Sequence, residues 1–309
     1  MTPPSPPLRT EPALTPRDGA AALLVIVIWA LNFIFGKVGL SELPPLLMLA
    51  LRFVLVTVLL LPFLGRIRRR QWRLVVAVSV VLGVCHFGLM FFGLAHVGAG
   101  PAAIAIQLTV PFSAILGWVC FGERIGRVQL AGMAMAFCGV YLLAGEPAGT
   151  ATEAASRASN SWYLLAVTGA AFAWAVANVL IKRLGPINVF TLNGWVALIA
   201  APHLLAASLL LEHGQAAAIA AAGWRAWSAV VFMAVASSIV AYGLWYFLIE
   251  RYPMNRVVPM TLLSPVLAVV FAVLLLGETL SATMVVGGIL TLGGVAVIEL
   301  IRPAPPPMA

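Results

Sequence analysis

The side chains of this sequence best suited to bind a solute are polar residues placed inside long apolar runs. Asn32 and Asn178 lie in the middle of two such runs, and Arg52 lies inside a third. A polar group at such a position is costly and marks a functional site by default. The two amides could hydrogen-bond a polar solute or join neighbouring helices. Arg52 could bind a carboxylate through two parallel hydrogen bonds or serve a structural role.

Aromatic and titratable side chains accompany these residues. Trp29, Trp174, Tyr242 and Trp245 are expected to line a central cavity, and ordinary packing is the alternative. His86 is the most central titratable side chain, with His203 second. An imidazole can exchange a proton near neutral pH, so His86 is a candidate for proton coupling as well as for solute binding.

Two prolines lie at nearly corresponding places in two other apolar runs. Gln107 and Pro111 share one run, and Pro265 lies in the other. A proline inside a helix frees a backbone carbonyl and can bend the helix. We expect Gln107 to bind solute and the two prolines to act as hinges, with simple packing kinks as the alternative.

The composition indicates what must position these residues. The chain is 62% hydrophobic and 9% charged, with a mean hydropathy of +1.06. Soluble domains carry about a quarter charged residues, so this chain is an integral membrane protein. Because lipid offers no hydrogen bonds, the fold class is all-α. Ten runs are long enough to span a bilayer: 20–40, 44–64, 74–95, 102–121, 127–145, 162–184, 189–211, 226–249, 257–276 and 282–301.

The basic residues predict the orientation. If the N-terminus is cytoplasmic, fourteen Lys and Arg residues fall in the loops on that side and only Arg157 and Arg225 on the other. This bias is typical of cytoplasmic loops, and it places both termini in the cytoplasm. The fourteen are Arg9, Arg17, Arg66, Arg68, Arg69, Arg70, Arg73, Arg124, Arg127, Lys182, Arg183, Arg251, Arg256 and Arg302.

An internal repeat divides the chain. Gly122, Glu123, Gly132 and Gly139 recur at a constant offset of 155 residues, as Gly277, Glu278, Gly287 and Gly294. Each half then holds five spans, an odd number, so the second half must enter the membrane upside down. Inverted repeats of this kind build secondary transporters with a solute site between the halves. Glu123 and Glu278 precede helices and are expected to cap them.

The predicted organisation is a disordered tail (1–18), a first repeat (19–145), an outer linker (146–161), a second repeat (162–302) and a short tail (303–309). Lys37 lies near the outer end of its span and is expected to act mainly as an anchor.

These motifs resemble the drug/metabolite transporter superfamily, EamA type. The resemblance is carried by Trp29-Ala-Leu-Asn32-Phe, Leu51-Arg52-Phe53, Phe121-Gly-Glu-Arg, Tyr242-Gly-Leu-Trp245 and Arg256-Val-Val-Pro259. It implies ten helices around a central cavity in the bacterial inner (plasma) membrane. Within the superfamily, the chain is most similar to exporters of cysteine and O-acetylserine, although His86 stands where those exporters are expected to carry a neutral amide.

The sequence therefore predicts secondary export of a small polar metabolite, an amino acid first, with lipid and the solute as partners. A drug or other metabolite carrier is the alternative within the class. A membrane-embedded enzyme or a structural subunit is the alternative outside it. The chain has no G-x-x-x-x-G-K-[ST] motif, so we expect no direct ATP drive and no cofactor. Its Cys and His spacing indicates no metal site, and it has no polar basic domain for nucleic acid.

Overall fold

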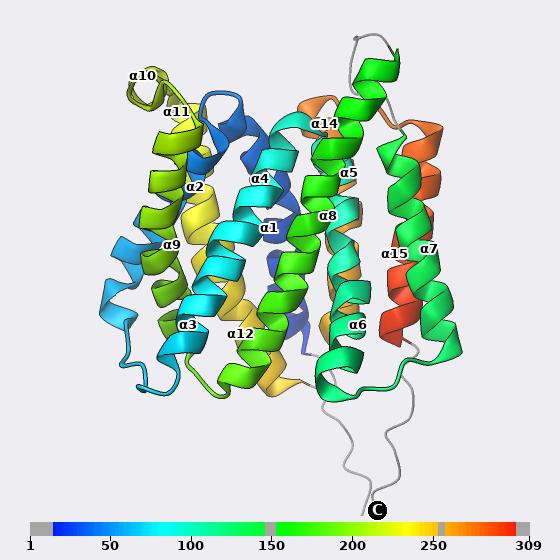
Figure 1. The fold of residues 1–309 in the computed structure, drawn as a ribbon, viewed down its shortest axis with the longest axis horizontal. Helices are drawn as coiled ribbons and strands as arrows, with labels where there is room; N and C mark the ends of the chain where they lie inside the picture. The colour runs from blue at the N-terminus through cyan, green and yellow to red at the C-terminus, as the bar shows by residue number, and fades with distance from the viewer. Residues whose placement is uncertain (1–14, 146–152, 253–256, 301–309) are drawn as a thin grey trace, which may run out of the picture.

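The computed structural model describes residues 15–145, 153–252 and 257–300. In these ranges ten helical segments are long and apolar enough to cross a membrane (Figure 1), which confirms the ten predicted spans. They are Pro16–Leu40, Pro45–Phe63, Trp72–His96, Ala99–Phe121, Arg127–Ala144, Ser161–Leu184, Val189–Leu211, Trp224–Arg251, Val258–Leu276 and Ala282–Leu300.

The first five spans contain ten helical elements. In chain order these are α1 (Pro16–Leu40), α2 (Pro45–Leu60), η1 (Leu61–Phe63), α3 (Trp72–Val78), η2 (Ser79–His86), α4 (Phe87–His96), α5 (Ala99–Ala105), η3 (Ile106–Leu108), α6 (Thr109–Phe121) and α7 (Arg127–Ala144).

The described part of the second half follows the same plan. Its elements are α8 (Glu153–Leu184), α9 (Val189–Leu211), α10 (Gln215–Ala221), α11 (Trp224–Phe232), η4 (Met233–Ala241), α12 (Tyr242–Arg251), η5 (Val258–Leu262), α14 (Leu263–Leu276) and α15 (Ala282–Leu300).

The first helix begins earlier than the sequence suggests. Thr15 is its N-cap, since its side chain accepts a hydrogen bond from the Asp18 backbone N–H at 3.2 Å, and Pro16 occupies the first helical position. Proline is favoured there because its missing N–H has no partner to lose. Residues 16–18 therefore belong to α1 and not to the predicted tail, while residues 1–14 lie outside the described range. The predicted linker 146–161 is likewise helical from Glu153 onward.

The two halves have opposite orientations. Successive spans alternate in direction, so the α6–α7 bend lies at the lower end of the bundle and the α14–α15 bend at the upper end (Figure 1). Both bends begin at a glycine in the left-handed region, Gly122 at φ 67° and Gly277 at φ 69°. That conformation ends a helix and favours glycine over any other residue. The same motif at opposite ends confirms the inverted repeat.

Departures from α-helical geometry also repeat. The third and eighth spans each contain a π-helical segment, η2 and η4. The fourth and ninth contain a 3-10 segment, η3 and η5, shortly before Pro111 and Pro265. Since proline lacks the N–H that would continue α-helical bonding, a tighter turn just before it is a natural adjustment. π-Segments inside helices are frequent at functional sites.

Close contacts between helices join the halves. α7 packs against α15, α2 against α9, α1 against α14 and α8 against α6. The glycine motif explains the tightest of these contacts. A Cβ atom added to Gly294 would lie 2.6 Å from the Ala136 backbone nitrogen, so only glycine allows α7 and α15 to approach this closely.

We predict that Gly294→Ala destabilises the protein while the neighbouring Gly293→Ala does not. A Cβ on Gly293 would have Met135 Cε, at 3.8 Å, as its nearest neighbour, which is ordinary contact. The overpacking caused by Gly294→Ala should cost about 1–3 kcal/mol. Thermal unfolding of the two variants in detergent measures the difference, and equal melting temperatures would contradict this account of the α7–α15 contact.

Candidate functional site

Arg52 of α2 is the most deeply buried cation of the described chain. Its side chain is 1% exposed, so the guanidinium does not extend to the protein surface. Nε and Nη2 donate to Ser238 Oγ in η4 at 3.2 and 2.9 Å, and Cζ lies 4.7 Å from the centre of the Phe87 ring. Nη1 has no hydrogen-bond partner. Within residues 15–145, 153–252 and 257–300, no carboxylate lies within ion-pairing distance of it.

Ser238 holds the guanidinium and depends on the π-segment. Its hydroxyl donates to the carbonyl of Met233, five residues earlier, at 2.8 Å. The hydroxyl proton is therefore directed away from Arg52, and the oxygen lone pairs face the cation. Asn193 of α9 secures the same turn, because its Nδ2 donates to the Ser238 carbonyl at 2.6 Å. α2, α9 and η4 are thus joined by polar contacts at one level of the bundle.

Arg52, Ser238, Asn193 and Phe87 are called the polar group below. His86 lies beside it, at the end of η2. It is 1% exposed, and its Nδ1 lies 2.9 Å from the Ala170 carbonyl of α8. A carbonyl only accepts, so we assign the imidazole proton to Nδ1. The imidazole ring stands edge-on to the Trp174 ring, with 4.5 Å between the ring centres, and its centre lies 4.7 Å from that of the Phe87 ring. His86 and Trp174 are therefore brought together, and the ring of Phe87 contacts both His86 and the Arg52 guanidinium.

The remaining aromatic candidates meet around Trp29. The centre of the Trp29 ring of α1 lies 5.9 Å from that of Tyr242 and 5.3 Å from that of Trp245, both on α12. Asn32 is one helical turn beyond Trp29. Its Oδ1 atom is buried and has no hydrogen-bond partner. Tyr242 follows Ser238, the hydrogen-bond partner of Arg52, by four residues, about one helical turn, which brings the aromatic group toward the cation.

Other predicted site residues do not join this group. Asn178 is exposed on α8, whereas its counterpart Asn32 is partly buried. Gln107 is partly buried in η3, and in the described ranges it makes no ring contact or side-chain hydrogen bond to the group. Pro111 and Pro265 are buried near the starts of α6 and α14, and their role as hinges stays a prediction. His203 is exposed and bonds its own helix through the Ile199 carbonyl, at 2.7 Å.

Charged side chains secure the ends of helices at both ends of the bundle. At the upper end, Lys37 Nζ donates to the carbonyls of Leu94, Ala95 and Val97 at 2.9, 3.1 and 2.7 Å, at the end of α4. It therefore anchors α4 as well as its own helix. Glu278 accepts from the first two backbone N–H groups of α5, on Ala99 at 2.5 Å and on Gly100 at 3.1 Å.

The expectation that each glutamate caps a helix holds for Glu278, but the helix is α5 of the other half and not the one that follows it. Glu123, at the lower end, pairs with Lys182 of α8 at 2.7 Å, and both side chains are more than half exposed. The lower end is also closed by Tyr252, whose hydroxyl donates to Asp18 Oδ2 at 2.5 Å. Each of these contacts joins one half to the other.

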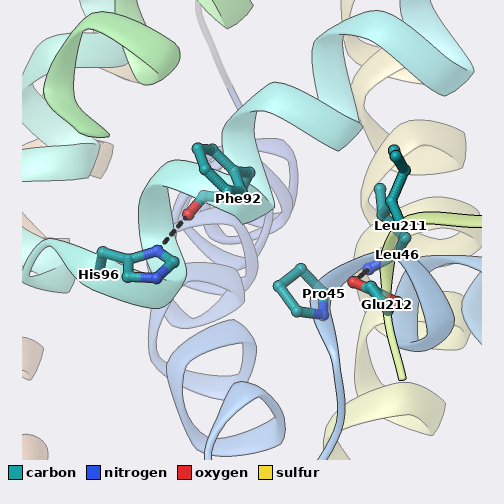
Figure 2. Close-up of a pocket in the computed structure, with 6 residues that line it drawn as sticks. All are labelled: Pro45, Leu46, Phe92, His96, Leu211 and Glu212. Atoms are coloured by element: carbon teal, nitrogen blue, oxygen red, sulfur yellow. Dashed lines mark hydrogen bonds between the residues drawn. The ribbon is translucent and has the colours of Figure 1, made fainter. Parts of the chain in front are cut away.

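A pocket of about 360 Å³ lies above the polar group at the upper end (Figure 2). Its walls come from the ends of α2, α4 and α9, the helices that carry Arg52, Phe87 and Asn193 deeper in the bundle. His96 and Phe92 face Pro45 and Leu46 across it, and Glu212 holds the start of α2 by accepting from the Leu46 N–H at 2.8 Å. Leu46 is about 9 Å above Arg52 along α2, from the rise of 1.5 Å per residue.

Three residues of the polar group were missed by sequence reasoning: Phe87, Asn193 and Ser238. Asn193 carried a signal similar to that of Asn32, an amide inside an apolar span although near its start, and the same rule would have found it. Ser238 is one of a Ser-Ser pair in an apolar run, a weak signal because serine is common in membrane helices. Nothing in the sequence distinguishes Phe87 from the other phenylalanines.

The architecture defines a class of protein. A bundle of ten membrane helices in two inverted halves, with polar side chains from both halves meeting inside, is the plan of a secondary transporter. Among the described residues, no three His, Cys, Asp or Glu side chains are grouped so that they could hold a metal ion.

Comparison with known proteins identifies the family. Residues 19–145 and 160–300 match the model of the EamA-like transporter family, and the chain belongs to that family. The two matched segments coincide with the two halves of the repeat.

Similar proteins have been described in enteric bacteria. A probable amino-acid metabolite efflux pump of Salmonella typhimurium is 34% identical over 285 residues, with 90% of this chain and 93% of the relative covered. The protein of the same name from Escherichia coli K12 is 33% identical over 289 residues, with the same coverage. A solved crystal structure with 20% identity aligns with a TM-score of 0.62, covering 93% of this chain and 97% of the other, which supports the fold.

We predict that Glu278→Ala destabilises the protein more than Glu42→Ala does. Removing the Glu278 carboxylate leaves two partly buried N–H groups at the start of α5 without an acceptor, at a cost of about 1–3 kcal/mol. Glu42 accepts from the exposed Gly223 N–H, which water can replace. Thermal unfolding in detergent checks this, and an equal or larger loss for Glu42→Ala would be inconsistent with the cap.

Proposed function

We propose that this protein is a secondary exporter of small polar metabolites, with amino acids of the cysteine and O-acetylserine class as the first candidates. The observation that carries the proposal is the group of buried polar side chains drawn from both halves, above all Arg52, which has no carboxylate partner among the described residues. A buried cation without an anion is costly, and a solute carboxylate would complete it. The names of the enteric relatives support an amino-acid substrate.

Alternating access is the mechanism that the inverted halves favour. Contacts between the halves exist at both ends: Glu278 on α5 at the upper end, and Lys182 with Glu123 at the lower end. Opening one set while the other remains closed would expose the polar group to each side in turn. The upper contact is partly buried and the lower one is largely exposed, so the lower contact should open more readily.

The proposed location is the inner (plasma) membrane, with both termini in the cytoplasm. The support is the concentration of Lys and Arg in the loops at the lower end, where α1 begins. In this orientation the pocket of Figure 2 faces the outside and lies on the exit side of the polar group.

A counterflow assay in proteoliposomes tests the proposal. Vesicles loaded with unlabelled L-cysteine or O-acetyl-L-serine should accumulate the labelled amino acid from outside, with saturation and without ATP. Empty vesicles and vesicles loaded with glucose are the controls. Exchange of other metabolites or drugs, but of no amino acid, would replace the proposal with the alternative of a carrier for another solute. Turnover of a solute into a product would indicate an enzyme.

We predict that His86→Gln shifts or abolishes the pH dependence of export, because His86 is the candidate for proton coupling. Glutamine can still donate to the Ala170 carbonyl, so the α8 contact is preserved while the titratable group is lost. Initial rates across a pH series measure the effect, and His203→Gln, on an exposed face of α9, is the matched control. An unchanged pH profile in His86→Gln would leave His86 a structural link between helices.

A further inference from the structure

Two buried polar atoms of the described chain have opposite hydrogen-bonding needs and lie on the helices that meet at the polar group. Arg52 Nη1 is a charged donor without an acceptor, and Asn32 Oδ1 is an acceptor without a donor. Building on the function proposed above, we propose that they bind the two charges of an α-amino acid: Nη1 holds the carboxylate, and Oδ1 accepts from the ammonium group.

The direction of the free guanidinium edge is set by the protein. Nε and Nη2 are both occupied by Ser238 Oγ, and the Phe87 ring lies 4.7 Å from Cζ. Only Nη1 remains to meet a ligand, and a charge-assisted bond to a carboxylate is its strongest available partner. Ser238 is a positioning residue. Its hydroxyl donates a hydrogen bond to the Met233 carbonyl, and its oxygen orients the guanidinium without neutralising the charge.

Asn32 is on the face of α1 that approaches the same group. It follows Trp29 by three residues, which places both on one side of the helix. Trp29 packs on Tyr242, and Tyr242 follows Ser238, the partner of Arg52, by four residues, about one helical turn. An ammonium group near Asn32 Oδ1 would also be attracted to the faces of these aromatic rings. No carboxylate of the described residues is paired with Arg52, so the ligand itself would supply the negative charge.

The proposed site predicts a pattern of ligand selectivity among variants that a non-specific polar pocket would not produce. A solute lacking the carboxylate should be rejected through Arg52 alone, and a solute lacking the ammonium through Asn32 alone. L-Cysteine, L-cysteine methyl ester and N-acetyl-L-cysteine differ in only these groups. Ligand-induced thermal stabilisation of the purified protein measures binding to each of the three without requiring transport.

We expect the wild-type protein to bind L-cysteine about 10- to 100-fold more tightly than either analogue, the range for a lost charged hydrogen bond. Arg52→Gln should abolish the preference over the methyl ester and keep the preference over N-acetyl-L-cysteine. Asn32→Ala should do the reverse. Ser238→Ala should reduce the preference over the methyl ester, because Arg52 is then no longer oriented.

Thr57→Val is the matched control on α2, since Thr57 Oγ1 donates only to its own helix, at the Phe53 carbonyl. It should leave both preferences unchanged. Size-exclusion profiles report folding, and if Arg52→Gln does not fold, Arg52→Lys keeps the charge and should reduce the preference over the methyl ester.

The experiment distinguishes a failure of the two-charge site from a failure of the proposed export function. If the wild-type protein binds and exchanges L-cysteine while the Arg52 and Asn32 variants keep both preferences, the two-charge site is wrong and the proposed export stands. If the wild-type protein neither binds nor exchanges any of the three compounds or O-acetyl-L-serine, both proposals are overturned. The crossed pattern of lost preferences supports both.

Discussion

Hydrocarbon offers no hydrogen-bond partner, and this constraint accounts for most of the arrangement of polar groups in the molecule. Each backbone must bond within its own helix, and each end or irregular turn needs a partner from elsewhere. Lys37 donates hydrogen bonds to the carbonyls at the end of α4, and Glu278 accepts hydrogen bonds from the first N–H groups of α5. The turn between these two helices is thus held by one charge of each sign. The glutamate comes from the opposite half, so a local requirement of one helix becomes a link across the repeat.

The repeat is symmetric in its backbone and asymmetric in its side chains. η2 and η4 occupy equivalent places in the third and eighth spans, and η3 and η5 do so in the fourth and ninth. Yet η2 contributes His86 and η4 contributes Ser238, while Asn32 is partly buried and Asn178 is exposed. Under the proposed alternating access, the two inverted halves need near-equivalent backbone shapes so that the protein can open toward either side. Under the proposal that the solute carries two different charged groups, its two sides need different partners, and the absence of side-chain symmetry around Arg52 is consistent with that.

Much of the fold could be predicted from the sequence. The ten spans and the inversion follow from the lengths of the apolar runs and the offset of the glycine motif, because bilayer thickness and close helix packing act on the chain locally. The structure places the candidates Trp29, His86, Trp174, Tyr242 and Trp245 in ring contacts between helices, and their role in lining a cavity stays a prediction. Gln107 and Asn178 satisfied the same rule, and the structure does not bring them into the polar group. Depth in a span can be counted along the sequence, but which way a side chain points cannot.

The sequence by itself determined that this is a membrane bundle of two opposed halves with a few polar residues inside. The tertiary structure alone decided which of those residues meet. Arg52 and Ser238 are 186 residues apart in the chain, and His86 and Ala170 are 84 apart. The length of an apolar run specifies that a helix spans the membrane, but lipid and protein interior are equally apolar, so it does not specify the helix face that packs inward. Only the assembled helices show that the Arg52 guanidinium is held by a serine and has one edge left free.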